Sequence, residues 1–272
     1  AFRPFFSRIS MILRRLIRRM TRHLNKLQIN LDELQNLINL YIETLEGSAQ
    51  GNIISPILAN IYMHNVLTLW YKFVIKSNTF GNSFLAVYAD DFIAGFQYKE
   101  DAERYYVSLK ERLKKFNLEL EESKSRMIEF GRYAEANSKR KYGKKPETFD
   151  FLGFTFYCGK GKKSGNFCVK LKTNRKKFQQ KLKAVKEWLY EHQTMPVKEL
   201  IMKLNTKLVG HYRYYGVSHN IAKIGAFLHF VQRYLFKVLN RRCHKQSYTW
   251  DGYIEMLKVY PLAKPKIYVK LF

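Results

Sequence analysis

The sequence predicts an α+β protein in which an antiparallel sheet with helices precedes a purely α-helical bundle. Two apolar, β-prone runs, residues 85–88 and 92–96, flank the adjacent acids Asp90 and Asp91, a pattern that indicates a β-hairpin with carboxylates at its tip. From Thr173 onward, apolar residues recur every three or four positions, which is typical of packed helices. The sheet therefore comes first along the chain, and the bundle follows it.

The N-terminal residues predict two helices and a loop. Residues 1–27 contain no acid and many arginines, and their apolar spacing predicts an amphipathic helix with a basic face. This segment is either a mitochondrial-type presequence or a piece of the fold, and a first residue other than Met suggests a fragment. A second helical pattern follows Asp32 and ends near Gly47. Residues 47–52 predict a loop, after which Ser55-Pro56 begin a helix that continues to about residue 76.

The elements after the hairpin alternate between helix and strand. Asp101 opens a predicted helix that ends near Phe116, and residues 117–120 predict a strand. Residues 131–148 predict a flexible surface excursion, and the alternation over residues 149–157 predicts another strand. Helices are then expected over residues 178–189, 196–215 and 227–238, with a tail from residue 248 that packs back on them.

The charge of the chain indicates a polyanionic partner. The formal net charge is +27, and residues 158–272 carry 25 lysines and arginines against only 5 acids. Such a surplus favours nucleic acid, although a solvated basic surface or an anionic membrane surface would show the same charge. No apolar run reaches the roughly 18 residues that would span a bilayer.

The cysteines indicate a reducing compartment. Cys158, Cys168 and Cys243 are odd in number and form no C-x-x-C pair, so they fit neither a disulfide framework nor a zinc site. We therefore expect an intracellular protein, in the bacterial cytoplasm or alternatively in an organelle matrix.

Five blocks in order resemble the group II intron reverse transcriptase/maturase family. The first is the Gly-Ser-Ala-Gln-Gly loop with its helix, and the second is the Tyr-Ala-Asp-Asp box; the blocks cover residues 47–62, 88–91, 118–124, 151–154 and 208–216. The resemblance implies part of a right-hand polymerase palm followed by an α-helical thumb/maturase bundle. It divides the chain into a basic helical segment (1–46, a remnant of fingers or palm), a palm (47–157) and a thumb with the maturase-specific domain (158–272).

The same resemblance implies RNA-directed DNA synthesis from deoxynucleoside triphosphates with Mg²⁺. Asp90 and Asp91 would hold the metal, and adjacent carboxylates at a rigid turn suit a hard divalent cation. The residues that would border the nucleotide are Gln50, Gly51, Tyr88 and Lys124. For Lys124, the alternative interpretation is a solvated surface cation.

Implied nucleic-acid contacts lie in the second half of the chain. The partners would be intron and template RNA together with a DNA primer or product. Phosphate contacts would come from lysines and arginines and base stacking from a tyrosine, and the expected residues are Gly153, Arg175, Lys176, Lys177, Lys181, Lys207, Arg213 and Tyr214. Gly153 is equally compatible with a packing role, and His211 favours packing or a phosphate contact over metal binding.

The chain departs from the family pattern in its catalytic acids. The family's first catalytic aspartate lies on a strand before the Gln-Gly loop, and the acids ahead of Gly47 all fall in a helical pattern. Smaller departures are Ala49, Asn52 and Val87. The first metal-binding block is therefore missing, and the leading interpretation is an N-terminally truncated reverse transcriptase/maturase. Two alternatives stand beside it: a non-catalytic RNA-binding splicing factor, and a split enzyme whose missing palm segment is supplied in trans. No Cys/His cluster indicates the nuclease domain of some relatives.

Overall fold

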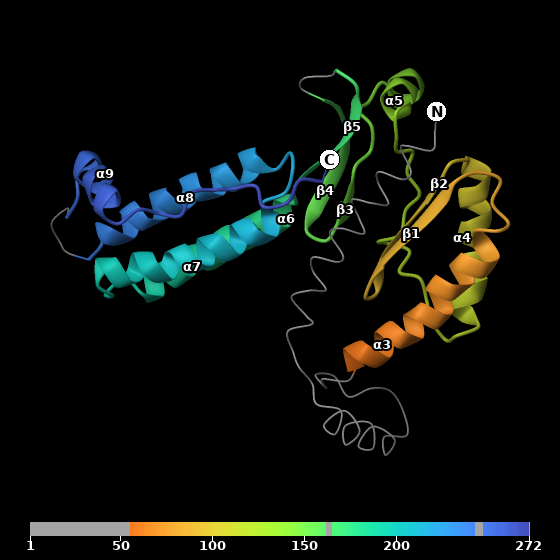
Figure 1. The fold of residues 1–272 in the computed structure, drawn as a ribbon, viewed down its shortest axis with the longest axis horizontal. Coiled ribbons are helices and arrows are strands. Elements are labelled where there is room, and N and C mark those ends of the chain that lie inside the picture. The colour runs from red at the N-terminus through yellow and green to blue at the C-terminus, as the bar shows by residue number, and fades with distance from the viewer. Residues whose placement is uncertain (1–54, 162–164, 243–246, 272) are drawn as a thin grey trace, which may run out of the picture. The chain divides into compact units, whose positions relative to one another are not determined.

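The computed structural model describes residues 55–161, 165–242 and 247–271. The chain forms two compact units, residues 1–128 and 129–272 (Figure 1). The helices predicted ahead of Gly47 and the loop at residues 47–52 lie outside the described residues. The predicted division at residue 157 stays a prediction about family domains, and the compact units divide earlier, between residues 128 and 129.

Unit 1 consists of a helical segment, a hairpin and a helix. In order these are α3 (Ser55–Met63), the π-helical η1 (His64–Leu69) and η2 (Tyr71–Ile75), β1 (Ser83–Tyr88), β2 (Asp91–Phe96) and α4 (Lys99–Lys114). The predicted helix and hairpin are confirmed, but the helix contains two π-helical stretches, η1 and η2, on either side of Trp70. Within the hairpin, β1 pairs antiparallel with β2, with Tyr88 opposite Asp91.

The core of unit 1 lies between the helices and one face of the hairpin. Buried side chains of η1, η2 and α4 form the cluster, namely Val66, Leu67, Tyr71, Tyr105, Leu109 and Leu113. Leu85 and Val87 of β1 pack against it, and so does Phe92 of β2. Burial of this apolar area is the main force that holds the hairpin on its helices.

Two predictions within unit 1 need correction. Asp101 does not open α4, which begins at Lys99; its buried carboxylate instead accepts hydrogen bonds from the backbone of Phe80 and Gly81. Residues 117–120 form no strand, because Asn117 takes a left-handed φ of +52° and turns the chain after the helix. The apolar alternation had a different cause: Leu118 and Leu120 pack on the helical core without a strand neighbour.

Unit 2 begins with a short helix and a three-stranded antiparallel sheet. The helix is α5 (Ala134–Tyr142), which replaces part of the excursion expected over residues 131–148. The strands are β3 (Phe149–Phe151), β4 (Phe154–Lys160) and β5 (Phe167–Thr173), in the order β3-β4-β5. The single strand expected over residues 149–157 is therefore a hairpin, and β5 was not predicted.

A helical bundle follows the sheet. It contains α6 (Arg175–Glu191), α7 (Val197–Tyr215) and α8 (Ile221–Leu239), which confirms the three predicted helices, and α9 (Trp250–Val259), which the sequence did not reveal. The α7 stripe of Leu200, Leu204 and Leu208 is fully buried. The tail packs back on the bundle as expected, because Val269 forms a parallel bridge with Val217 and Leu271 is buried. None of the helices in the described part of the chain is long and apolar enough to cross a bilayer.

Candidate active site and nucleic-acid surface

The tip of the β1–β2 hairpin presents two adjacent carboxylates. Asp90 lies in the two-residue turn, Asp91 is the first residue of β2, and both are exposed. The preceding Ala89 has a left-handed φ of +52°, which is unfavourable for a residue with a Cβ. Strain of this kind is concentrated at functional turns, so the tip has the local signature of a site.

The pairing register separates the faces of the hairpin. Side chains alternate along a strand, so the positions of Leu85 and Val87 share the face that packs on the helices. Tyr88 and its partner Asp91 belong to the other face. Asp91 therefore lies on the hairpin face that points away from the helical core, next to the turn.

The chemistry of this tip fits Mg²⁺ in one particular mode. Mg²⁺ in phosphate-transfer sites is held by one or two carboxylates, with water and substrate phosphates completing the octahedron. Asp90 and Asp91 supply two carboxylates. Throughout the described ranges, no group of three or more His, Cys, Asp or Glu could hold a metal ion. The described residues thus fit a substrate-completed site and not an all-protein cage.

The expected nucleotide contacts are only partly described. Gln50 and Gly51 lie outside the described residues, and Tyr88 is half-buried at the end of β1. Lys124 lies in an exposed turn, and its Nζ is 4.0 Å from Glu121. The pKa of Glu121 is lowered by a hydrogen bond from the Ser123 hydroxyl and by the nearby Lys124 charge. The contacts of Lys124 fit its solvated interpretation as well as a phosphate-facing one.

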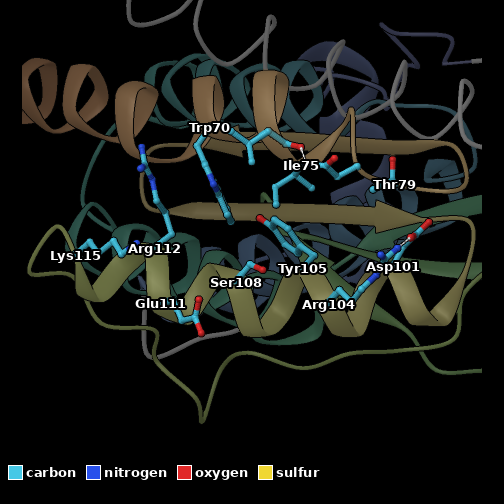
Figure 2. A pocket seen from close by; sticks show the side chains of 12 residues that line it. Trp70, Ile75, Thr79, Asp101, Arg104, Tyr105, Ser108, Glu111, Arg112 and Lys115 are labelled. Carbon is cyan, nitrogen blue, oxygen red and sulfur yellow. Dashed lines mark hydrogen bonds and ion pairs between the residues drawn. The ribbon is translucent and has the colours of Figure 1, made fainter.

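A depression on the helical side of unit 1 is separate from the hairpin tip. Residues from Trp70 to Thr79 line it on one side and residues of α4 on the other, and Figure 2 shows Trp70 over Tyr105 and the Asp101–Arg104 ion pair at one end. Its volume is about 380 Å³, and neither Asp90 nor Asp91 lines it. The Trp70 and Tyr105 rings are stacked with centroids 5.9 Å apart. This hollow therefore belongs to the packing behind the hairpin and not to the carboxylate site.

In unit 2, the start of α6 concentrates positive charge. Asn174 caps the helix by accepting a hydrogen bond of 3.2 Å from the Lys177 amide. The first turn then carries Arg175, Lys176 and Lys177, all exposed, and no acid. A helix N-terminus bears a partial positive charge, so three cations there oppose helix stability unless an anion is bound.

The neighbouring helix α8 reinforces this basic end. Lys223 lies 5.7 Å over the ring of Phe178, and Arg241 lies 5.3 Å over the ring of Tyr190. The N-terminal turns of α8 and α6 are thus in contact, and so are the residues at their C-terminal ends. The two helices therefore run parallel. The first turn of α8 has no acid either. Lys223 was missed from the sequence, although the acid-free start of its helix was a usable signal.

The remaining predicted contacts differ in accessibility. Lys181, Lys207 and Arg213 are exposed, as expected. Tyr214 is half-buried, its hydroxyl donates a 3.2 Å hydrogen bond to the Leu152 carbonyl, and its ring stacks on Phe154. The stacking face of Tyr214 is therefore used within unit 2.

Gly153 and His211 both have structural explanations. Gly153 has a φ of +73° in the two-residue turn between β3 and β4, and Leu152 beside it also has a positive φ. Two positive φ values are what a tight hairpin turn requires. His211 is buried, with its ring stacked 3.8 Å from that of Phe227, and burial lowers its pKa to about 4. His211 is thus a packing residue in this structure.

Comparison with known families gives the chain its identity. Residues 12–156, just over half of the chain, match the reverse transcriptase (RNA-dependent DNA polymerase) family. This chain belongs to the reverse transcriptase family. Residues 175–253 match the group II intron, maturase-specific domain, so the protein is a group II intron reverse transcriptase/maturase. A comparison with curated proteins finds no match.

The two candidate sites of this reverse transcriptase/maturase fall in different matched regions. The carboxylate hairpin lies within the polymerase match, and the basic starts of α6 and α8 lie within the maturase match. Helix α9 begins inside the second match, at Trp250. The family assignment thereby agrees with the resemblance that the sequence blocks indicated.

Proposed function

We propose that this chain supplies part of an RNA-directed DNA polymerase whose maturase domain grips intron RNA. The exposed Asp90–Asp91 pair at a strained two-residue turn carries the proposal for the polymerase. Asp90 and Asp91 would hold Mg²⁺, which when bound supplies Lewis-acid stabilisation of phosphoryl oxygens. We propose that the protein acts inside the cell.

The chain's own residues would orient the substrates. Tyr88 lies opposite Asp91 in the β1–β2 pairing, beside the two carboxylates. Gln50 and Gly51 would border the deoxynucleoside triphosphate. Lys124 provides a cation for charge that builds on the leaving group. Gly153 holds the β3–β4 turn, and the backbone carbonyl of Gly153 accepts a 2.9 Å hydrogen bond from Asn174, which anchors the start of α6 to that turn.

Polymerisation through two metal ions calls for an acid beyond this pair. We propose that a further palm segment contributes that acid and completes the site. The test is primer extension on an RNA template with Mg²⁺, using the 272-residue chain alone and then with a separately expressed N-terminal palm segment. Extension only after complementation supports a polymerase site that this segment completes, and Asp90→Asn should abolish the extension. Extension by the chain alone would overturn the need for a partner.

A second candidate is a splicing factor that retains RNA binding without polymerisation. The departures from the family pattern favour it, namely the helical sequence pattern around the acids ahead of Gly47 and the residues Ala49, Asn52 and Val87. Tight binding of intron RNA with no extension in either arm would select this function over the polymerase.

RNA binding by the bundle has its own test. Replacing Lys176, Lys177 and Lys181 with Ala should weaken binding of single-stranded RNA and reduce the slope of log affinity against log salt by about 2, because each lost phosphate contact accounts for about 0.7. Lys258→Ala on α9 is the matched control, since Lys258 is exposed and paired with Glu255 at 2.6 Å. An unchanged slope in the triple variant would contradict the proposed surface.

A further inference from the structure

A second basic site lies at the far end of the α6–α8 pair. A shallow depression of about 630 Å³ is lined by Lys183, Lys186, Glu187, Tyr190 and Arg241. These residues come from the last turns of α6 and the chain just after α8. At about 1.5 Å per residue, the depression lies on the order of 15–20 Å along α6 from the basic start of that helix.

The charges in the depression are only partly compensated. Lys183 pairs with Glu187 at 3.7 Å. Lys186 has its Nζ 5.9 Å from the Tyr190 ring and 6.0 Å from the Tyr234 ring, and Arg241 lies over Tyr190. Within the part of the chain that the structure describes, neither Lys186 nor Arg241 has a carboxylate within ion-pair distance. Two cations over aromatic rings are therefore left to attract an anion.

Helix-end stabilisation does not account for all of this charge. A cation near a helix C-terminus is favourable, which explains part of the placement of Lys186 and Arg241. However, the adjacent Arg242 has its Nε and Nη2 buried with no hydrogen-bond partner among the described residues. Nε and Nη2 form the edge with which arginine guanidinium groups commonly donate two parallel hydrogen bonds to a carboxylate or phosphate. This end of the bundle thus carries two donors that its own acceptors leave unsatisfied, although Arg242 does not line the depression itself.

The aromatic ring of Tyr190 in the depression indicates which class of polyanion would bind there. The guanidinium carbon of Arg241 lies over the ring of Tyr190, 5.3 Å from the ring centroid, and we call this pair the Tyr190–Arg241 platform. Unstacked RNA bases stack on aromatic rings and on guanidinium planes, while lysines contact the phosphates. The depression is shallow and open, which suits one unit of a polymer.

We propose that this depression binds one nucleotide of single-stranded RNA, with the base against the Tyr190–Arg241 platform and the phosphate at Lys186. The proposal rests on the proposed RNA binding of the bundle and adds a contact at the opposite end of α6. One RNA strand then touches the bundle at two points, the start of α6 and this platform.

The test uses the full chain and a short single-stranded oligoribonucleotide with one 2-aminopurine, whose fluorescence falls when it stacks. Tyr190→Leu should abolish the quenching and weaken binding roughly tenfold, the effect of removing one base stack. Tyr190→Phe keeps the ring and should bind as the wild type does. Arg241→Lys keeps the charge but loses the plane, so the quenching should fall while the salt slope stays.

Lys186→Ala separates the phosphate contact from the stack. It should lower the salt slope by about 0.7 and leave the quenching in place. Lys264→Ala, an exposed lysine of the tail outside the depression, should change neither the quenching nor the affinity appreciably. Circular dichroism of each variant checks that the bundle is folded.

The outcomes distinguish the two proposals. If the wild type does not bind RNA, the proposed function fails. If the wild type binds and the Lys176/Lys177/Lys181 variant weakens it, but Tyr190→Leu and Arg241→Lys leave quenching and affinity unchanged, then this platform proposal alone is overturned. Weaker binding by Tyr190→Leu with unchanged quenching would also overturn it, because Tyr190 would then contribute to binding without stacking on the base.

Discussion

Asn220 and Thr173 exchange two buried hydrogen bonds of 2.8 Å. The Thr173 amide donates to Asn220 Oδ1, and Asn220 Nδ2 donates to Thr173 Oγ1. The same Nδ2 donates to the Tyr215 carbonyl at 2.8 Å. One fully buried amide thus joins the end of β5, the end of α7 and the start of α8. Because Thr173 immediately precedes the cap of α6, this junction brings the two basic helix starts to one place.

Replacing Asn220 with Ala should destabilise unit 2 and weaken RNA binding together. The change leaves the Thr173 amide without its buried acceptor, which costs about 1–3 kcal/mol. Urea unfolding measures this loss, and the RNA affinity of the folded fraction should also fall, because the two helix starts lose their common anchor. Asn205→Ala is the matched control: Asn205 joins Pro261 and Ala263 of the tail, so it should affect stability without affecting RNA affinity.

Stability should decrease with acidification through His211. Burial lowers its folded pKa to about 4, below the unfolded value of about 6.5, so protons bind the unfolded state more readily. Its contribution is complete above about pH 6.5 and is lost as the pH falls towards 4. Unfolding free energy should drop by about 2 kcal/mol between pH 7 and pH 5.

His211→Phe should remove that decrease, since Phe can retain the packing on Phe227. His229→Gln, at an exposed position of α8, should leave the decrease intact. The same pH dependence in wild type and His211→Phe would assign the decrease to another group.

Asp101 should stabilise unit 1 only while it is ionised. Burial alone would raise its pKa, but the amides of Gly81 and Phe80 and the charge of Arg104 outweigh burial and lower it. The contribution is therefore present above about pH 4 and is lost as the pH falls through the folded pKa. Asp101→Asn should lower the unfolding free energy by about 2 kcal/mol at neutral pH. The gap between wild type and variant should narrow in acid, and a constant gap would contradict the ionised role.

Two glycines with left-handed φ offer a matched pair. Gly153 has φ +73°, and a Cβ there would lie 3.1 Å from the Tyr215 hydroxyl oxygen; Gly143 has φ +61° and no atom within 4 Å of its Cβ position. Gly143→Ala should cost about 1–2 kcal/mol from backbone strain alone. Gly153→Ala should cost more, because Tyr215 must move. Equal losses in thermal unfolding would show that Tyr215 adapts freely.

Local patterns were enough for the carboxylate tip and the bundle. Asp90 and Asp91 lie between two apolar runs that are close together in sequence, and the short turn sets the register of the two strands. Helices α6, α7 and α8 repeat apolar residues with the helical period, so their existence follows from burying one stripe each. In both cases, residues close together in the sequence were sufficient to predict the element.

Other elements depended on partners that are distant in sequence. The alternation at residues 117–120 reads as a strand, but Leu118 and Leu120 pack on helices and have no strand to pair with. The run at residues 149–157 reads as one strand, but the left-handed Leu152–Gly153 turn divides it. Tyr214 lies off the apolar stripe of α7, so the sequence predicted that it would stack on RNA bases. In the structure its hydroxyl is bonded to the Leu152 carbonyl and its ring is stacked on Phe154.

The sequence by itself determined the family, the acidic hairpin tip and the basic composition of the bundle, because each is carried by residues adjacent in the chain or repeated at a helical period. Only the tertiary structure decided that Lys223 joins the α6 cations, that Arg241 covers Tyr190, and that Asn220 holds these helices in parallel. Such contacts arise from packing between segments tens of residues apart, and spacing along the chain does not encode which faces will meet.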